Sequence, residues 1–274
     1  MRFLIASLLS LLLLSACNNG ADSSAKTSAQ EGNTLIVEAT PMKTTLMEIE
    51  PLVVSFRFYN PTDSTMGLKI PTVKGWDIKV DGYAIDLRAF PNIPKEYFLL
   101  PAKQDTVFSM DWPGDKLWVQ GTLLGDHELR FDYLHQDGGS IAVSPFKVTV
   151  EEMTDSEIAA AAAYDVIKMA PSEDVEKLAD QFLEFYPASV LTNHVKLRKA
   201  GTLLYDAKRQ DLCQQLLDEV YYNNPIRSEQ VDAATYLAHI YNRNQNYRKM
   251  YELWRPLDPH KAKRFKKLAD AMGQ

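Results

Sequence analysis

The side chains of this 274-residue chain that are best suited to metal binding or nucleophilic catalysis are five histidines and two cysteines. No histidine has the HExxH, HxH or cysteine-paired spacing of a metal site. Motifs such as G-x-S-x-G and G-x-x-x-x-G-K do not occur either. We expect His127 and His135 to be surface or rim residues. The pair Glu151-Glu152 and the acids from Glu173 to Glu184 fit solvated faces better than an acid–base pair.

The composition narrows the classes of function further. The formal net charge is −6, and apolar residues make up 46% of the chain. That apolar share supports a packed core, whereas an acidic chain is a poor candidate for nucleic-acid binding. The sequence therefore predicts a protein that is not an enzyme and holds no cofactor and no metal. An enzyme with a site assembled from distant residues is the alternative.

The first seventeen residues have the composition expected of a targeting signal. Arg2 precedes an apolar run, Phe3 to Leu14, that is too short to be a comfortable membrane-spanning helix. The run leads into Leu14-Ser15-Ala16-Cys17, and the whole arrangement closely resembles the lipobox signal of bacterial lipoproteins. The resemblance implies that residues 1–16 are removed and that Cys17 is acylated and anchored in the lipid bilayer. The alternative is an ordinary signal peptide with an incidental cysteine.

Residues 17–33 are rich in Ser, Ala, Asn, Gly and Gln and have no apolar periodicity. They predict a lipidated, flexible tether with a root-mean-square reach of about 20–25 Å. Asn18 resembles the residue that follows the cysteine in enterobacterial lipoproteins sorted to the outer membrane, where Asp would retain the protein in the inner membrane. The resemblance implies a lipid-anchored protein of the cell envelope, at the outer membrane and facing the periplasm.

Residues 34–150 show the period of two that is typical of strands. Apolar side chains alternate over Leu52–Phe58, Trp76–Val80 and His127–Tyr133, and Asp81-Gly82 is a hairpin signal. About seven short strands without a helical stretch predict an antiparallel β-sandwich. Its layout is similar to the immunoglobulin-like domains of bacterial surface and periplasmic proteins, although the Cys…Trp…Cys signature of antibody domains is absent.

Two tryptophans of this domain suggest another kind of function. Trp112 and Trp118 flank a Pro-Gly-Asp-Lys loop. Exposed tryptophans can stack on sugars, so binding of a carbohydrate or envelope polymer through the sandwich loops is the alternative function. Burial of one or both tryptophans in the core is the favoured interpretation.

After Glu151 the hydrophobic period changes to 3.6, which predicts helices over 151–274. Thr154-Asp155-Ser156-Glu157 is a capping box at the start of the first helix. Pro187, Pro225 and Pro259 follow at intervals of 38 and 34 residues, which indicates a repeat of helical hairpins.

Residues 194–227 resemble a tetratricopeptide repeat. The positions that carry this resemblance are Leu197, Ala200, Gly201, Leu204, Cys213, Leu217, Val220 and Pro225. Cys213 occupies a close-packing position of the second helix, and with Cys17 acylated it has no disulfide partner, so we expect it to be buried. In this family the first helix of each hairpin lines a groove that binds partners. The resemblance assigns that groove to Arg198, Thr202, Tyr205, Asp232, Thr235, His239 and Asn242.

The Lys and Asn residues of the clamp that grips C-terminal carboxylates are missing, so we do not expect a chaperone tail as partner. The basic segment 260–267 is expected to be a helix that closes the repeat array. Its alternative role is contact with anionic lipid, polysaccharide or an acidic partner. Taken together, the sequence predicts a membrane-anchored envelope lipoprotein that acts as a non-enzymatic, protein-binding scaffold through its helical groove.

Overall fold

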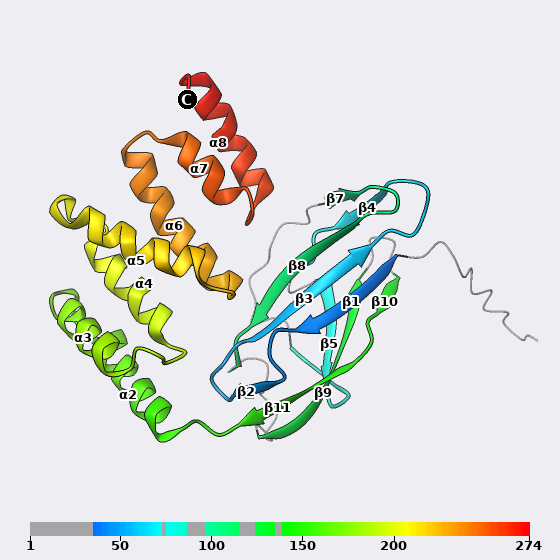
Figure 1. The fold of residues 1–274 in the computed structure, drawn as a ribbon, viewed down its shortest axis with the longest axis horizontal. Coiled ribbons are helices and arrows are strands. Elements are labelled where there is room, and N and C mark those ends of the chain that lie inside the picture. Colours follow the sequence, from blue (N-terminus) through cyan, green and yellow to red (C-terminus); the bar gives the residue numbers. More distant parts are fainter. Residues whose placement is uncertain (1–34, 73–74, 87–96, 115–123, 135–138) are drawn as a thin grey trace, which may run out of the picture. The chain divides into compact units, whose positions relative to one another are not determined.

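A computed structural model describes residues 35–72, 75–86, 97–114, 124–134 and 139–274. The signal segment, Cys17, the tether, Trp118 and His135 lie outside these residues. The described chain forms strands in its first half and seven α-helices in its second half (Figure 1). The predicted fold class, a β-sandwich followed by helical hairpins, is confirmed.

The strands form two main sheets and one separate two-stranded sheet. The first sheet has the order β1-β3-β8 and is antiparallel; its strands are β1 (Ile36–Pro41), β3 (Leu52–Tyr59) and β8 (Asp105–Trp112). The second sheet has the order β2-β11-β9-β5-β6, with β10 also paired to β9; its strands are β2 (Thr45–Met47), β5 (Trp76–Val80), β6 (Tyr83–Ala84), β9 (Gly125–Leu134), β10 (Ser140–Ala142) and β11 (Phe146–Glu151). The two-stranded sheet pairs β4 (Met66–Lys69) with β7 (Tyr97–Leu100) in the antiparallel direction.

The sheet orders β1-β3-β8 and β11-β9-β5 match the A-B-E and G-F-C orders of immunoglobulin-like sandwiches. One pairing departs from the predicted antiparallel arrangement, because β2 runs parallel to β11. The chain leaves β1 in one sheet and enters β2 in the other within a few residues, so β2 meets the last strand in the parallel direction.

Aromatic side chains from the two sheets fill the space between them. Phe56 of β3 packs against Trp76 and Phe131 of the other sheet, with ring centroids 4.0 and 5.3 Å apart. Trp112 is fully buried and meets Phe131 at 5.2 Å. Such pairs add about 0.5–1.5 kcal/mol each beyond their burial. The expectation that at least one of the two tryptophans belongs to the core is confirmed by Trp112.

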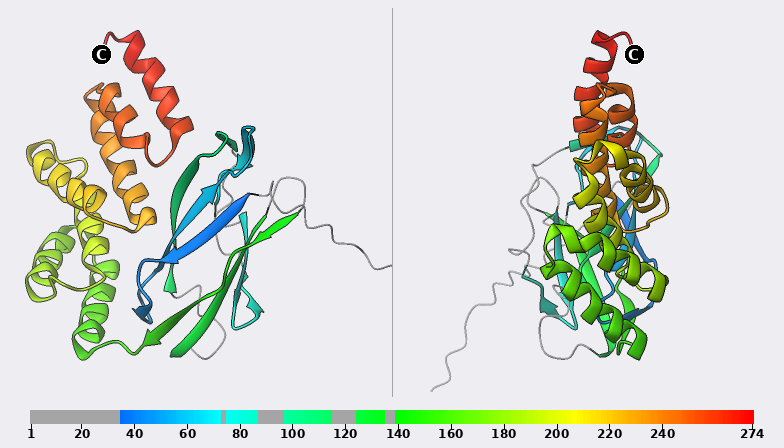
Figure 2. Two further views of the ribbon diagram at one scale, coloured as in Figure 1. Left: turned by 45° about the vertical axis from the view of Figure 1, so that its right-hand side comes forward. Right: turned by 90° about the vertical axis from the view of Figure 1, so that its left-hand side faces the viewer.

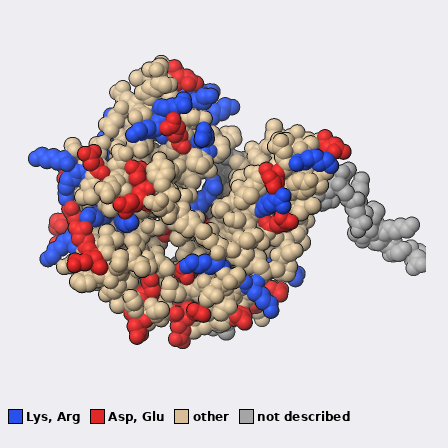
Figure 3. Space-filling model, in the orientation of Figure 1, with Lys and Arg blue, Asp and Glu red and all other residues tan. Residues whose placement is uncertain are grey.

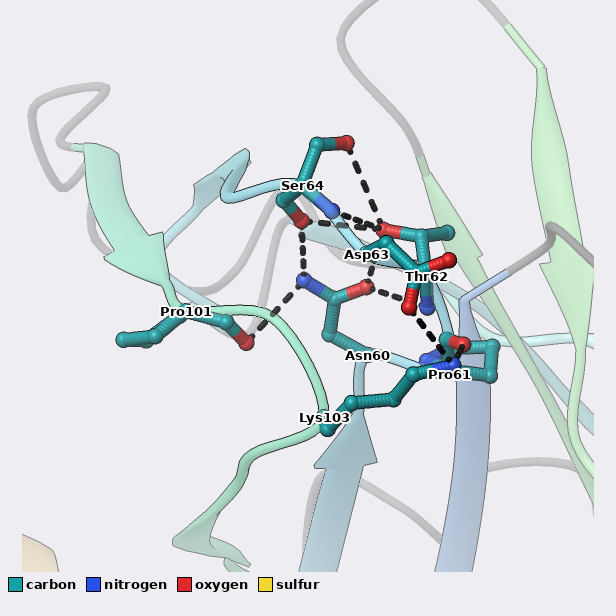
Figure 4. A network of polar contacts seen from close by, with 7 residues as sticks. All are labelled: Asn60, Pro61, Thr62, Asp63, Ser64, Pro101 and Lys103. Carbon is teal, nitrogen blue, oxygen red and sulfur yellow. Dashed lines mark hydrogen bonds and ion pairs between the residues drawn. The ribbon is translucent and has the colours of Figure 1, made fainter.

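A buried asparagine ties together two connections of the sandwich, as Figure 4 shows. Asn60 follows β3, and its side-chain amide nitrogen donates to the carbonyls of Ser64, Leu100 and Pro101 at 2.8–3.0 Å. Its amide oxygen accepts from the Thr62 backbone N–H at 3.0 Å. The turn after β3 is therefore fixed to the turn between β7 and β8.

The helices form three successive hairpins and a further helix (Figure 2). Their bounds are α2 (Asp155–Met169), α3 (Ser172–Phe185), α4 (Thr192–Leu203), α5 (Gln210–Tyr222), α6 (Arg227–Arg243), α7 (Tyr247–Trp254) and α8 (Pro259–Ala271), with a 3₁₀ turn, η3 (Ala207–Arg209), before α5. The last strand ends at Glu151 and the first helix begins at Asp155.

The start of α2 contains only half of the predicted capping box. The Thr154 hydroxyl accepts from the Glu157 backbone N–H at 3.2 Å, as predicted. The Glu157 carboxylate instead accepts from Ser189 Oγ at 2.7 Å and from the Val190 backbone N–H at 3.2 Å. The predicted reciprocal bond from the Glu157 carboxylate to the start of the helix was wrong. Donors in the α3–α4 connection, more than thirty residues away in the chain, bind both carboxylate oxygens instead.

Cys213 lies in the core of the helical part, as predicted. It is fully buried, and its Sγ lies 3.3 Å from the Ala200 carbonyl oxygen on α4. Burial raises the pKa of the Cys213 thiol. The cysteine therefore packs as a small apolar residue between α4 and α5.

A strand residue caps α6. The Ser228 backbone N–H donates to Asp111 Oδ1 on β8 at 2.9 Å, and its hydroxyl donates to Asp111 Oδ2. The first N–H groups of a helix have no partners within the helix, and Ile226 before α6 offers no side-chain cap. Asp111 supplies that cap from the sandwich.

Candidate partner-binding face

The first helices of the three hairpins share one face. Helix α2 contacts α4, and α4 contacts α6. The Tyr164 ring on α2 stacks on His194 of α4, with ring centroids 5.9 Å apart and planes inclined by 30°. His194 Nε2 in turn lies 3.3 Å from Glu229 Oε1 on α6. We call the surface that follows this row along α2, α4 and α6 the first-helix face.

The floor of the face at this end is a buried carboxylate. Glu229 is only 3% exposed and accepts from the side-chain amides of Asn193, at 3.0 Å, and Asn224. Burial raises the pKa of Glu229, while His194 and the two amides act in the opposite direction. Burial likewise raises the pKa of Asp232 one turn further along α6, with His194 opposing that shift. His194 therefore acts on the pKa of two carboxyl groups, the buried Glu229 and the exposed Asp232.

The three groove residues predicted around α4 follow one another along the helix. Arg198 is exposed, and its Nη2 donates to the Ala170 carbonyl after α2 at 3.4 Å. The Thr202 hydroxyl donates to the Lys199 carbonyl of its own helix at 2.7 Å. Tyr205 lies just beyond α4 and is 77% exposed. Arg198 and Tyr205 therefore offer free contact surface, whereas the Thr202 hydroxyl proton is already donated.

The four groove residues predicted on α6 are all exposed: Asp232, Thr235, His239 and Asn242. Their spacing of three and four residues places them along one side of the helix. The Thr235 hydroxyl donates to the Val231 carbonyl of the same helix at 2.8 Å. Asp232, His239 and Asn242 are the members of this set with side chains free to meet a ligand.

The groove residues predicted around α4 and those predicted on α6 form two rows. Residues that the sequence analysis did not single out join these rows at both ends. At one end His194 connects α4 to Glu229 on α6. At the other end the Arg243 guanidinium lies 5.5 Å from the centre of the Tyr205 ring and donates to the Leu204 carbonyl. His194 precedes Arg198 by one helical turn, so the same spacing argument could have found it. The Tyr205–Arg243 contact joins residues 38 positions apart and leaves no local signal.

A second candidate surface lies on α5, the second helix of its hairpin. A shallow hollow of about 480 Å³ is lined by polar side chains: Asp211, Gln214, Gln215, Asp218, Glu219, Tyr222 and Asn223. Burial raises the pKa of Asp218. Glu219 is paired with Lys196 at 2.8 Å, which lowers its pKa. The sequence analysis missed this hollow because three- and four-residue polar spacing is the ordinary pattern of a solvated helix face.

One histidine prediction was wrong. His127 is 5% exposed, not a surface or rim residue, and its Nδ1 lies 2.7 Å from Asp81 Oδ2. This hydrogen bond lowers the pKa of Asp81. The error arose because His127 has the inward parity of β9 and a partner from the β5–β6 turn. In the described parts of the chain no group of three His, Cys, Asp or Glu side chains could hold a metal ion.

None of the helices among the described residues is long and apolar enough to cross a membrane.

No family model matches the sequence, and no curated protein matches it. Among solved structures, the chain is similar to the CARDB domain of the PF1109 protein from Pyrococcus furiosus, with 12% identity over 45% of this chain and 97% of that chain and a TM-score of 0.29. It is also similar to the β-glucosidase from Listeria innocua, with 14% identity over 44% of this chain and 17% of that chain and a TM-score of 0.30. The third likeness is to the sporulation control protein Spo0M from Bacillus subtilis, with 12% identity, 48% and 54% coverage and a TM-score of 0.28. Likenesses of this size identify no function, and the fold class rests on the strand order and helices described above.

Proposed function

We propose that this protein is a lipid-anchored lipoprotein of the cell envelope that acts as a non-enzymatic scaffold and binds a protein partner on its first-helix face. In this proposal the helical part is a tetratricopeptide-like array, and acylated Cys17 holds it at the outer membrane on the periplasmic side. The lipobox resemblance of residues 1–17 supports the anchor.

The observation that carries the binding proposal is the continuous row across the three first helices. Tyr164, His194 and Glu229 touch in sequence, and each comes from a different hairpin. A row of this kind presents one surface built from several repeats, which is how helical arrays bind extended partners. Exposed Arg198, Tyr205 and His239 supply charge, aromatic surface and hydrogen-bonding groups along it.

The test is capture of a partner from detergent-solubilised envelopes with the lipidated protein as bait. We expect the variant R198A/Y205A/H239A to lose the partner, because arginine and tyrosine side chains dominate many protein interfaces. The matched control is K177A/Q181A/F185A, whose residues are exposed on the second helix α3. Equal capture by both variants and the wild type would remove the first-helix face from the proposal. Circular dichroism of each variant establishes that the fold is intact.

The alternative function, sugar binding through the sandwich loops, depended on exposed tryptophans, and one of them is not exposed. Trp112 is fully buried, so its ring cannot stack on a ligand. Trp118, the other tryptophan of that argument, lies outside the described residues. No described residue favours this alternative over the first-helix face.

A further inference from the structure

The last two helices carry a charge opposite to that of the rest of the chain. Residues 247–274 hold eight Lys and Arg against three Asp and Glu, a net charge of +5 in a chain whose total is −6. The remaining residues therefore sum to −11. The eight cations are Arg248, Lys249, Arg255, Lys261, Lys263, Arg264, Lys266 and Lys267. In Figure 3 blue side chains gather over this end of the helical part, at the top of the view.

Helix α8 turns most of its cations outward. Ala262 and Ala269 are buried on the side that packs against the helical core. His260, Lys263, Arg264, Lys266 and Lys267 are all exposed. Spacings of three and four residues place His260, Lys263 and Lys267 on the same side of the helix, with Arg264 and Lys266 beside them. We call these five residues the α8 cationic face.

Few of these charges are neutralised within the protein. Arg248 pairs with Glu252 at 2.9 Å. The Lys261 ammonium lies over the Trp254 ring, 3.2 Å from its centre, and so fastens α8 to α7. Lys263, Arg264, Lys266 and Lys267 make no ion pair with any residue that the structure describes. Their positive potential therefore extends into the solvent, over about 10 Å at 0.1 M salt.

Two apolar side chains border the cationic face. Leu268 is 46% exposed and Met272 is 54% exposed. They lie four residues apart on one side of the helix end, and Leu268 follows Arg264 by the same interval. A helix with a basic face edged by exposed apolar side chains is typical of peptides and proteins that lie on a bilayer surface. Nucleic acid and acidic polymers would meet the cations but would leave these apolar side chains in water.

We propose that the α8 cationic face docks on a bilayer surface that carries anionic headgroups, with Leu268 and Met272 entering the headgroup region. The lipid anchor of the proposed function would bring such a surface close to the folded part. The docking itself uses residues outside the first-helix face. In a chain whose other residues sum to −11, this end would face an anionic membrane while the remainder is repelled from it.

The test uses a soluble fragment, so that neither the signal segment nor an acyl chain contributes. Residues 32–274 form one compact unit that excludes residues 1–31. This fragment is the protein used in the binding measurements. It is mixed with vesicles of phosphatidylcholine alone or with about one-third phosphatidylglycerol, and the bound fraction is measured by co-sedimentation. We expect binding to the anionic vesicles alone, and we expect it to weaken as salt is raised.

The variant K263Q/K267Q should bind the anionic vesicles about 25-fold more weakly, because each basic residue near an anionic surface contributes a factor of about five. The matched control is K177Q/K208Q, which removes two exposed lysines from α3 and η3. L268Q should weaken the binding that persists at high salt. Equal binding by K263Q/K267Q and the wild type, or equal binding to neutral vesicles, would overturn the proposal. Binding to soluble polyglutamate as tight as binding to vesicles would overturn it in favour of an acidic partner.

The two proposals fail independently. We expect K263Q/K267Q to capture the envelope partner as well as the wild type does, and R198A/Y205A/H239A to keep its vesicle binding. A lipid-docking defect with intact partner capture therefore concerns only α8, and the reverse result concerns only the first-helix face.

Discussion

The imidazole Nε2 of His194 lies 3.3 Å from Oε1 of Glu229, a carboxylate that is almost completely buried beneath the first-helix face. The contact joins α4 to α6 and therefore joins two hairpins of the array. Asn193 and Asn224 donate to the other oxygen of the same carboxylate, so three side chains converge on one carboxyl group. The geometry of the face at this end depends on Glu229.

Two replacements of Glu229 distinguish the contribution of its hydrogen bonds to stability from that of its charge. We expect Glu229→Ala to lower the free energy of unfolding by about 1–3 kcal/mol, because it leaves the buried Asn224 amide without its acceptor. Glu229→Gln keeps an acceptor oxygen and removes the charge, so it should cost clearly less than Glu229→Ala. Urea denaturation of both variants measures the difference. An equal loss in both would mean that the charge, and not the hydrogen bonding, matters.

The same carboxylate gives a pH dependence of known sign. Burial raises the pKa of Glu229 in the folded protein, so the folded state holds this proton more tightly than the unfolded state does. Its stabilising contribution is complete below the unfolded value of 4.5 and is lost as the pH rises through the folded value. The stability of the wild type relative to Glu229→Gln should therefore fall as the pH rises from 4.5 towards neutrality. Denaturation at several pH values checks this, and a constant difference would contradict it.

His194 and Asp111 also act electrostatically on this carboxyl group. A His194→Gln background removes the only imidazole among these groups. If Glu229 is the titrating group, the direction of the pH dependence should persist there. A dependence that disappears in this background would contradict the assignment to Glu229.

In the sandwich, Asn60 should be the most sensitive polar residue of the turn after β3. It is fully buried, and Asn60→Ala deprives the Leu100 and Pro101 carbonyls of their donor. We expect a loss of about 3 kcal/mol in the free energy of unfolding. Asn60→Asp should lose at least as much, because it places a carboxylate against three carbonyl oxygens.

Lys103→Gln is the control for Asn60→Ala. Lys103 lies in the turn between β7 and β8, which Asn60 ties to the turn after β3. Lys103 Nζ donates to the Pro61 carbonyl and pairs with Asp63 at 3.2 Å, both in exposed positions. An exposed pair of this kind contributes less than about 1 kcal/mol. Equal losses in Asn60→Ala and Lys103→Gln would show that the Asn60 network has no special weight.

The elements of this fold were predictable from periodicity, because a strand or helix buries one face and marks it in the sequence. The alternation over Leu52–Phe58 predicted β3, and the change of period after Glu151 predicted the start of the helices. Cys213 was predicted to be buried from its position in a helix–helix contact, and this is confirmed.

Contacts between distant residues were not predictable in the same way. Glu157 satisfies the local pattern of a capping box, yet its carboxylate binds Ser189 and the Val190 N–H. His127 has inward parity, but its burial becomes acceptable only because Asp81 lies beside it. Polar residues have no period that reports their partners, so which of them would meet on the first-helix face could be assigned only by resemblance and by the structure.

The Cys213 thiol should be inert in the folded protein. It is the only cysteine of the 32–274 fragment, it is fully buried, and burial raises its pKa, so little reactive thiolate forms near pH 8. A thiol-reactive disulfide reagent should label it slowly in buffer and rapidly in urea. The labelling rate then reports the opening of the α4–α5 contact. Fast labelling of the native fragment would contradict the close packing of Cys213 against Ala200.

The proposed lipid anchor makes a direct prediction about Cys17. In the full-length chain, Cys17→Ser removes the only sulfur that the lipobox resemblance assigns to acylation, so incorporation of labelled palmitate should be lost and the uncleaved precursor should accumulate. Cys213→Ser is the matched control, because it removes the other cysteine and should leave labelling unchanged. Equal labelling of Cys17→Ser and wild type would contradict the anchor.

Salt extraction tests the same anchor in a second way. Two or more acyl chains hold a protein at a membrane far more durably than headgroup contacts do. Cys17→Ser expressed without residues 1–16 should therefore leave the membrane fraction when salt is raised, whereas the lipidated wild type should remain.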